Sequence, residues 1–534
     1  MRSFVWIKIK GLTWSDKLSE YVLWLMALFL TEVWQLNYKT AVTGVNIFRG
    51  LEDIAPLTLQ HVVDSYLGNY GMAFLSSVAY TGGLVFLSLS ALGTCNTVGK
   101  NSCHVKKRYK FLFFLALPQL LVGISFHKLN SLEELLSEVE CLKPSKRLRL
   151  INIVAWIVVN LAGTFVLSRI DIWTLRFAIP TMCMLVATLF FWSCSVHNSI
   201  KRHDPPGSFL TTMRRVIVPS FYLRSTEPNQ GYDNTRTRYG RRLRCLDKAI
   251  INLPNNADQE QRNRVIRDVE EVKKFICRIP FCMAFFVLGI VSSVGDTYFI
   301  QQAANMDFKE YEAPIVVLQL WYELSKKLIS KLYMKIMQKL LKNNSRSNNN
   351  NSNNSNSSVH NLFSSKYAGC VGVAVSMIFA MLCCFTAANV EKHRLDKVKD
   401  MYDKHGTASD GIIPMSMFWL LPQFFLLGSF DGILDESIDL FCNTHEAPTS
   451  SDRVMRVFSL LIIGLGKIGS ILSVFVARKA SAWVGKTSWF EEDLNKSRLD
   501  KYYWVLAALS IANLVYYNIL YYCTSLRSEV RESY

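Results

Sequence analysis

Long apolar runs separated by polar segments dominate this chain of 534 residues, of which 50% are hydrophobic. Runs of about 18 or more residues with few charges are long enough to cross a bilayer. Only helices suit such runs, because each span must satisfy its own backbone hydrogen bonds in lipid. We divide the sequence into twelve runs, near 17–34, 41–63, 72–93, 109–126, 150–168, 173–194, 277–300, 313–335, 366–388, 412–440, 457–477 and 502–523.

The most polar stretch, residues 195–276, separates six of these runs from the other six. It holds sixteen Lys and Arg residues against nine acidic residues and contains several turn formers. Positively charged loops are retained on the cytoplasmic side of a membrane. The loops at 127–149 and 336–365 are basic as well, and an even number of spans puts both termini on their side. We therefore expect the termini and these three segments to be cytosolic.

This pattern predicts an all-α membrane protein made of two six-helix bundles. The expected parts are an N-terminal bundle (1–194), a basic cytosolic linker (195–276), a C-terminal bundle (277–524) and a cytosolic tail (525–534). Within the C-terminal bundle, residues 343–358 are almost entirely Asn and Ser, which predicts a disordered cytosolic loop.

The net charge of +18 does not indicate nucleic acid here, since the positive residues lie between apolar runs, where they set topology and meet anionic lipid. We find no nucleophile–base pair, metal cluster or phosphate-binding loop, so we expect neither an enzyme nor a cofactor. The thirteen cysteines are scattered. Cys95 and Cys103 share a short loop, where they are either free thiols or, if the loop is extracellular, a disulfide.

Single charges inside apolar runs are the candidates for function, because an ionisable group at that depth needs a partner or a water-filled cavity. Arg49 and Glu52 are three residues apart and can pair on one helix face. That pairing is either simple neutralisation or part of a solute path. Lys128 closes the fourth run, and Asp431 lies in the tenth, followed by Asp435 and Asp439 on the same helical face.

Lys128 and Asp431 have two possible roles. They bind opposite ends of a polar solute or exchange protons, or else Lys128 reaches to lipid headgroups and the aspartates reach the cytosol.

Several blocks resemble the plant nitrate transporter 1/peptide transporter family, which belongs to the proton-dependent oligopeptide transporters of the major facilitator superfamily. VVDSYLGNYGMAFLSSVAYTGGLVFLSLSA is similar to its second and third spans, and FAIPTMCMLVATLFF to its sixth. RDVEEVKKFICRIPF resembles the start of its seventh span. FWLLPQFFLLGSFDG resembles the tenth, and KTSWFEEDLNKSRLDKYYWVLAALSIANLVYY the twelfth. The resemblance runs through nearly the whole chain in order.

This resemblance implies substrate-binding roles for Lys128, which matches the fourth-span lysine, and for Asp431, which stands where the family usually has Glu. It also places a conformational loop motif on Asp64, Gly68 and Asn69, with Asn in place of the usual Arg. That change weakens a latch, because a charge-assisted pair becomes at best a neutral hydrogen bond.

The proton-coupling motif of the family, Glu-x-x-Glu-Arg, falls on residues 13–17, of which only Asp16 and Lys17 are charged. The simplest expectation is weak proton coupling. The competing expectation is that Asp431 or Glu52 has taken over the role.

The resemblance implies a secondary active transporter of the major facilitator fold that moves a small polar solute, nitrate or a di- or tripeptide, by alternating access. The alternatives are a proton-independent facilitator and a membrane sensor or scaffold that does not transport. We expect a monomer in the lipid bilayer, whose partners are the solute and protons and not nucleic acid. We expect the plasma membrane rather than the vacuolar membrane.

Overall fold

The computed structural model describes residues 2–93, 107–129, 135–136, 145–193, 207–222, 243, 245–246, 259–307, 315–349, 357–405, 413–442, 450–485, 488–491 and 494–532. These residues are almost all helical. The exception is one short parallel strand pair, β1 (Met306–Asp307) with β2 (Ile413–Ser416). Each of the twelve apolar ranges overlaps a helix, as the all-α prediction required.

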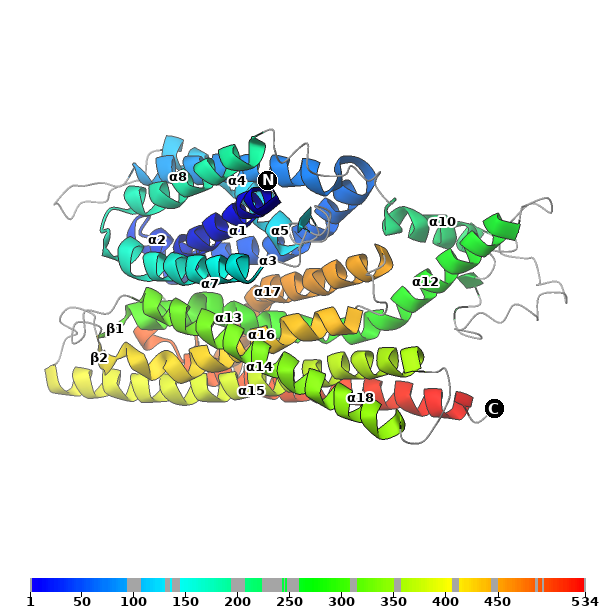
Figure 1. The fold of residues 1–534 in the computed structure, drawn as a ribbon. Helices are drawn as coiled ribbons and strands as arrows, with labels where there is room; N and C mark the ends of the chain where they lie inside the picture. Colours follow the sequence, from blue (N-terminus) through cyan, green and yellow to red (C-terminus); the bar gives the residue numbers. More distant parts are fainter. Residues whose placement is uncertain are drawn as a thin grey trace.

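The N-terminal half, drawn in blue and cyan in Figure 1, packs its helices into one layer of the molecule. The half contains α1 (Arg2–Trp24), α2 (Met26–Glu32), α3 (Tyr38–Val62), α4 (Gly68–Ala91), α5 (Lys107–Lys128), α7 (Lys146–Leu161) and α8 (Trp173–Trp192). Short π-helices follow α3 (η1, Val63–Leu67) and α7 (η2, Ala162–Val166), and η2 leads into a 3-10 turn (η3, Leu167–Arg169).

The C-terminal half, drawn in green to red, forms the other layer, and its helix α17 faces the first half (Figure 1). The half contains α12 (Gln259–Met283), α13 (Phe285–Ala304), α14 (Val316–Asn349), α15 (Ser357–His405), η5 (Met417–Leu420), α16 (Leu421–Cys442), α17 (Ser450–Gly485), η6 (Leu494–Lys496) and α18 (Leu499–Glu532).

Eight helical stretches of the described residues are long and apolar enough to cross a membrane, and α12 with α13, bent by 46°, makes a ninth. One of the eight, Tyr38–Ala91, contains both α3 and α4. Among the helices outside this set, α1 and α14 carry charged side chains that are buried in the interior, such as Lys8 and Glu323. The first expected span was therefore placed too late, since helix already begins at Arg2.

The linker and the Asn/Ser tract contain more helix than the sequence suggested. Helix α10 (Phe209–Tyr222) and most of α12 lie within 195–276. In the Asn/Ser tract, α14 continues to Asn349 and α15 starts at Ser357. The rest of that tract, residues 350–356, lies outside the described residues, as does the loop that holds Cys95 and Cys103.

Two ends of the molecule can be distinguished in Figure 1. We call the end that carries α10, the start of α12 and the chain's C-terminus the linker end, and the opposite end, with β1 and β2, the strand end. At the strand end the Tyr38 hydroxyl is 2.8 Å from Ser497 Oγ, and Lys39 Nζ donates to the Phe490 carbonyl at 3.0 Å. These contacts join the two halves there.

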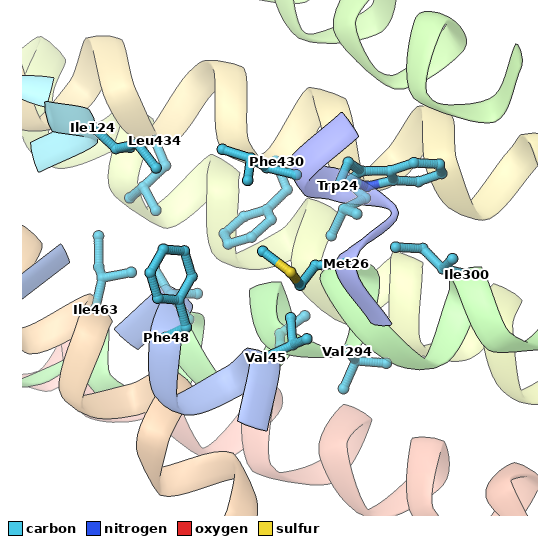
Figure 2. Close-up of a cluster of buried hydrophobic side chains, with 14 of the residues drawn as sticks. Trp24, Met26, Val45, Phe48, Ile124, Val294, Ile300, Phe430, Leu434 and Ile463 are labelled. Carbon is cyan, nitrogen blue, oxygen red and sulfur yellow. The ribbon is translucent and has the colours of Figure 1, made fainter. Parts of the chain in front are cut away.

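Helices α3 and α17 make the closest contact between the halves, because each has a glycine at the point where they cross. A Cβ atom on Gly50 would lie 2.7 Å from the Gly464 carbonyl oxygen, and one on Gly464 would lie 2.5 Å from that of Gly50. Apolar side chains from both halves fill the surrounding interface (Figure 2): Trp24, Met26, Val45, Phe48 and Ile124 with Val294, Ile300, Phe430, Leu434 and Ile463.

Candidate functional site

A cavity of about 450 Å³ lies between the two halves. Part of its wall is apolar and includes Trp24, Phe430 and Ile463, which Figure 2 labels among the buried side chains. The rest is densely charged. The acidic side chains are Asp16, Glu20, Glu52, Asp53, Asp296, Asp431 and Asp435, and the basic ones are Lys17, Arg49, Lys128, Lys326, Arg456 and Lys467.

The residues selected from the sequence as binding or coupling candidates lie around this one cavity. Lys128, Asp431, Asp16, Lys17 and Glu52 all contribute to its wall. They come from α5, α16, α1 and α3, so the fold brings together residues more than 400 positions apart in the chain. Asp64 and Gly68 of the loop motif do not line the cavity.

Lys128 is held inside the N-terminal half by two carboxylates of α3. Its ammonium lies 2.9 Å from Glu52 and is also bonded to Asp53. This placement excludes the alternative that Lys128 extends to lipid headgroups. The lysine ends α5, and its long side chain spans the distance to α3 because the two helices pack side by side.

Arg49 and Glu52 pair on one face of α3 at 3.1 Å, as their spacing predicted. Glu52 is 2% exposed and binds both Arg49 and Lys128. The two residues therefore neutralise each other, and both line the cavity.

Lys467 of α17 was not among the sequence candidates, although it is a single charge within the apolar run LLIIGLGKIGSILSV. Its ammonium lies 3.0 Å from Asp53 and 3.5 Å from Asp296 of α13. The ion pair with Asp53 crosses from one half of the molecule to the other. The criterion that selected Lys128 and Asp431, one charge inside a span, would have found Lys467 as well.

The charged residues of α1 also face the cavity. Lys17 lies 2.5 Å from Glu20 and 3.6 Å from Glu323, which belongs to α14 in the other half. Asp16 lies 3.7 Å from His127 of α5. Glu20 and Glu323 were not among the sequence candidates, because the resemblance to the coupling motif extends only over residues 13–17.

The three aspartates of α16 have separate partners. The Tyr322 hydroxyl donates a hydrogen bond of 2.7 Å to Asp431. Asp435 pairs with Lys326 at 2.8 Å, and Asp439 with Arg456 at 3.1 Å. Within the described residues, Asp431 has no ion pair of 4 Å or less. It is therefore the carboxylate of this helix that can accept a new cationic partner without losing one.

The loop motif lies at the linker end. Gly68 has a φ of +65°, a conformation that glycine adopts without strain. Asp64 accepts a hydrogen bond of 2.9 Å from Gln60 and lies 3.8 Å from Arg453 of α17. Although Asn69 replaces an arginine in this motif, Asp64 therefore still meets a guanidinium, and that guanidinium comes from the other half.

Comparison with known proteins supports the family resemblance noted in the sequence. The POT family model matches residues 151–490. Among curated proteins of Arabidopsis thaliana, Protein NRT1/PTR FAMILY 5.5 is 30% identical over 96% of this chain and 95% of its own length. Protein NRT1/PTR FAMILY 5.7 is 27% identical over 95% of this chain and 85% of its own length.

Solved structures share the architecture at much lower identity. An auto-inhibited POT family peptide transporter superposes with a TM-score of 0.64 at 15% identity, covering 97% of this chain and 96% of its own. A POT family transporter in complex with 5-aminolevulinic acid superposes with a TM-score of 0.57 at 11% identity, covering 95% and 94%. These neighbours confirm the expected fold of two helix bundles, that of the major facilitator superfamily.

Proposed function

We propose that this chain, which belongs to the POT family, moves a small solute carrying both a positive and a negative group across a membrane by alternating access. Membership of the family makes the chain a multi-pass membrane transporter and not an enzyme. The nature of the solute, the proton coupling and the orientation in the membrane are the proposed parts.

The placement of Lys128 and Asp431 is the observation that carries this proposal. They line one cavity from opposite halves of the molecule. A solute with an anionic and a cationic end binds both residues at once, and so it contacts both halves. Binding energy that depends on the relative position of the halves is what links a solute to their rocking motion.

The charge of the cavity favours the di- or tripeptide class over nitrate. Seven acidic side chains face six basic ones. Arg49, Lys128 and Lys467 each have a carboxylate within 3.1 Å, so a lone anion has to displace one of them. A protonated amine meets Asp431 without displacing a cation. The volume of the cavity also lies in the range of small-molecule sites, about 300–1,000 Å³.

We also propose that the transporter takes up protons and that Asp431 is the residue that receives them. Protonation of Glu52 or Asp53 disrupts ion pairs with two cations each, and protonation of Glu20 one with Lys17. Protonation of Asp431 disrupts no ion pair among the described residues. The charged groups that act on Asp431 are Lys326 of α14, Asp435 of α16 and Lys467 of α17, and Tyr322 is its hydrogen-bond donor.

Uptake in oocytes tests the function directly. We expect a labelled dipeptide to be accumulated, the same peptide with an acetylated amino group to be taken up far more slowly, and nitrate to be a poor substrate. Preferred uptake of nitrate would contradict the proposed solute class. Uptake that equilibrates without accumulating would identify a facilitator, and no uptake at normal surface expression would support a sensor or scaffold. We place the protein in the plasma membrane, which imaging of a tagged chain in plant cells checks.

A further inference from the structure

Six charged residues form one cluster where α3 meets α17. Arg49, Glu52, Asp53 and Lys128 belong to the N-terminal half, and Asp296 and Lys467 to the C-terminal half. Three are positive and three are negative, so the cluster is balanced. Glu52 lies 3.1 Å from Arg49 and 2.9 Å from Lys128, while Lys467 lies 3.0 Å from Asp53 and 3.5 Å from Asp296.

Lys467 is the cation that the C-terminal half contributes to this cluster. It is 9% exposed and Asp53 is 4% exposed, so water screens their attraction poorly. Each residue lies three positions beyond the glycine where the backbones of α3 and α17 meet, Gly50 and Gly464. The distance between Lys467 and Asp53 therefore follows directly from how α17 sits on α3.

Asp53 is shared by two lysines, Lys128 of its own half and Lys467 of the other. An attraction toward Lys467 lowers the hold of Asp53 on Lys128. The anionic end of a solute that binds Lys128 has to compete with Asp53 for that ammonium. Lys467 thus acts on the solute site through Asp53, without needing to touch the solute.

We propose that Lys467 is a positioning residue that links the position of the C-terminal half to the affinity of Lys128 for the anionic end of the solute. When α17 moves away from Asp53, this carboxylate is left with Lys128 as its remaining lysine partner, binds it more strongly and so favours release of the solute. When α17 returns, Lys467 attracts Asp53 and frees Lys128 to bind. The inference rests on the proposed transport of a solute with an anionic end.

The Michaelis constant for dipeptide uptake tests this link in four chains: wild type, Lys467→Met, Asp53→Asn and the double variant. Lys467→Met should raise KM about tenfold, the effect of one charged hydrogen bond. In the Asp53→Asn background the same change should leave KM nearly unaltered, because the competing carboxylate is gone. Lys326→Met is the matched control, since Lys326 pairs with Asp435 at 2.8 Å and its effect on KM should be the same in both backgrounds.

An equal rise of KM in both backgrounds, or none in either, would overturn the inference. A second measurement needs no solute: the unfolding temperature in detergent of these four purified chains and of Lys326→Met in both backgrounds. Lys467→Met should lower that temperature more with Asp53 present than with Asn at position 53, while Lys326→Met lowers it equally in both. Loss of this difference refutes the contact between the halves. If wild type takes up none of the solutes, the proposed function fails, and the unfolding temperatures still test the contact.

Discussion

The ammonium of Lys17 in α1 lies 3.6 Å from the carboxylate of Glu323 in α14, so that an ion pair connects the first helix of one half to the second half. The same ammonium holds Glu20 at 2.5 Å. One lysine therefore neutralises two carboxylates. Loss of the lysine removes both ion pairs, whereas loss of either carboxylate leaves the lysine paired with the other.

Removal of Lys17 should destabilise the protein more than removal of Glu323. Lys17→Met leaves Glu20 and Glu323 with no ion pair of 4 Å or less among the described residues, whereas Glu323→Gln leaves Lys17 paired with Glu20. We expect Lys17→Met to cost about 2 kcal/mol of unfolding free energy, less than for a fully buried pair because the lysine is 32% exposed. Thermal unfolding of the purified chains measures the order, with Lys335→Met, at an exposed position of α14, as the control. Equal effects of the two substitutions would contradict this arrangement.

Truncation at the two ends of the proposed solute site should abolish uptake. Lys128→Ala removes the ammonium between Glu52 and Asp53, and Asp431→Ala removes the carboxylate that faces Tyr322. We expect near-normal surface expression of both variants and dipeptide uptake close to background. Lys331→Ala, on the outer side of α14, serves as the control. If both variants still transport, the two residues serve the packing of the helices only.

The loop motif should act through the ion pair between Asp64 and Arg453. Asp64→Arg and Arg453→Asp each place like charges opposite one another at the linker end, and each should lower the maximal uptake rate. The double reversal restores opposite charges and should recover part of the rate. If the double variant is as slow as the singles, the 3.8 Å contact does not contribute to the transport cycle.

The sequence predicted the helices well because a membrane span is a local property. The apolar runs at 150–168 and 173–194, for example, fall on α7 with η2 and η3, and on α8. The first helix begins earlier than the expected range 17–34 because Lys8 and Asp16, like Glu20 within that range, resemble the charges of a soluble segment. They are tolerated within α1 because Asp16 and Glu20 face the cavity and Lys8 is buried and bonded to Ser193.

The partners of the candidate residues were harder to predict than the residues themselves. The spacing of Arg49 and Glu52 along one helix gave their pairing, since neighbours on a helix are fixed by its geometry. Lys467 with Asp53 and Lys17 with Glu323 are separated by hundreds of residues. Such pairs depend on how the two halves are packed together, which no local pattern contains.

The orientation in the membrane can be tested by cysteine labelling from outside intact cells. The charge distribution predicts that residues 225–240 are cytosolic. A cysteine introduced there, in a chain whose native cysteines are replaced by serine, should not react with an impermeant reagent. A cysteine at position 98, in the loop between the third and fourth spans, should react. Efficient labelling at 225–240 with none at position 98 would reverse the proposed orientation.

Acid stimulation of uptake should depend on Asp431. Its hydrogen-bond donor is Tyr322, and within the described residues it has no ion pair that a proton would disrupt. A symporter of this design takes up a proton on Asp431 from the acidic side together with the solute, whose ammonium then donates a hydrogen bond to the carbonyl oxygen of the neutral carboxyl. Dipeptide uptake should therefore be faster at about pH 5.5 than at about pH 7.5, and it should carry inward current.

Three substitutions separate the candidate proton sites. Asp431→Asn should remove the pH dependence, because the amide cannot take up the proton, and any remaining uptake should be the same at both pH values. Glu52→Gln should lower uptake at both values without flattening the profile, since Glu52 is held by Arg49 and Lys128. Asp16→Asn should keep the acid stimulation of uptake, because Asp431 of α16 can still take up the proton. A flat profile in wild type would instead support the weak coupling that the incomplete first-span motif suggests. A steep profile that survives Asp431→Asn and disappears in Asp16→Asn would return the proton to α1.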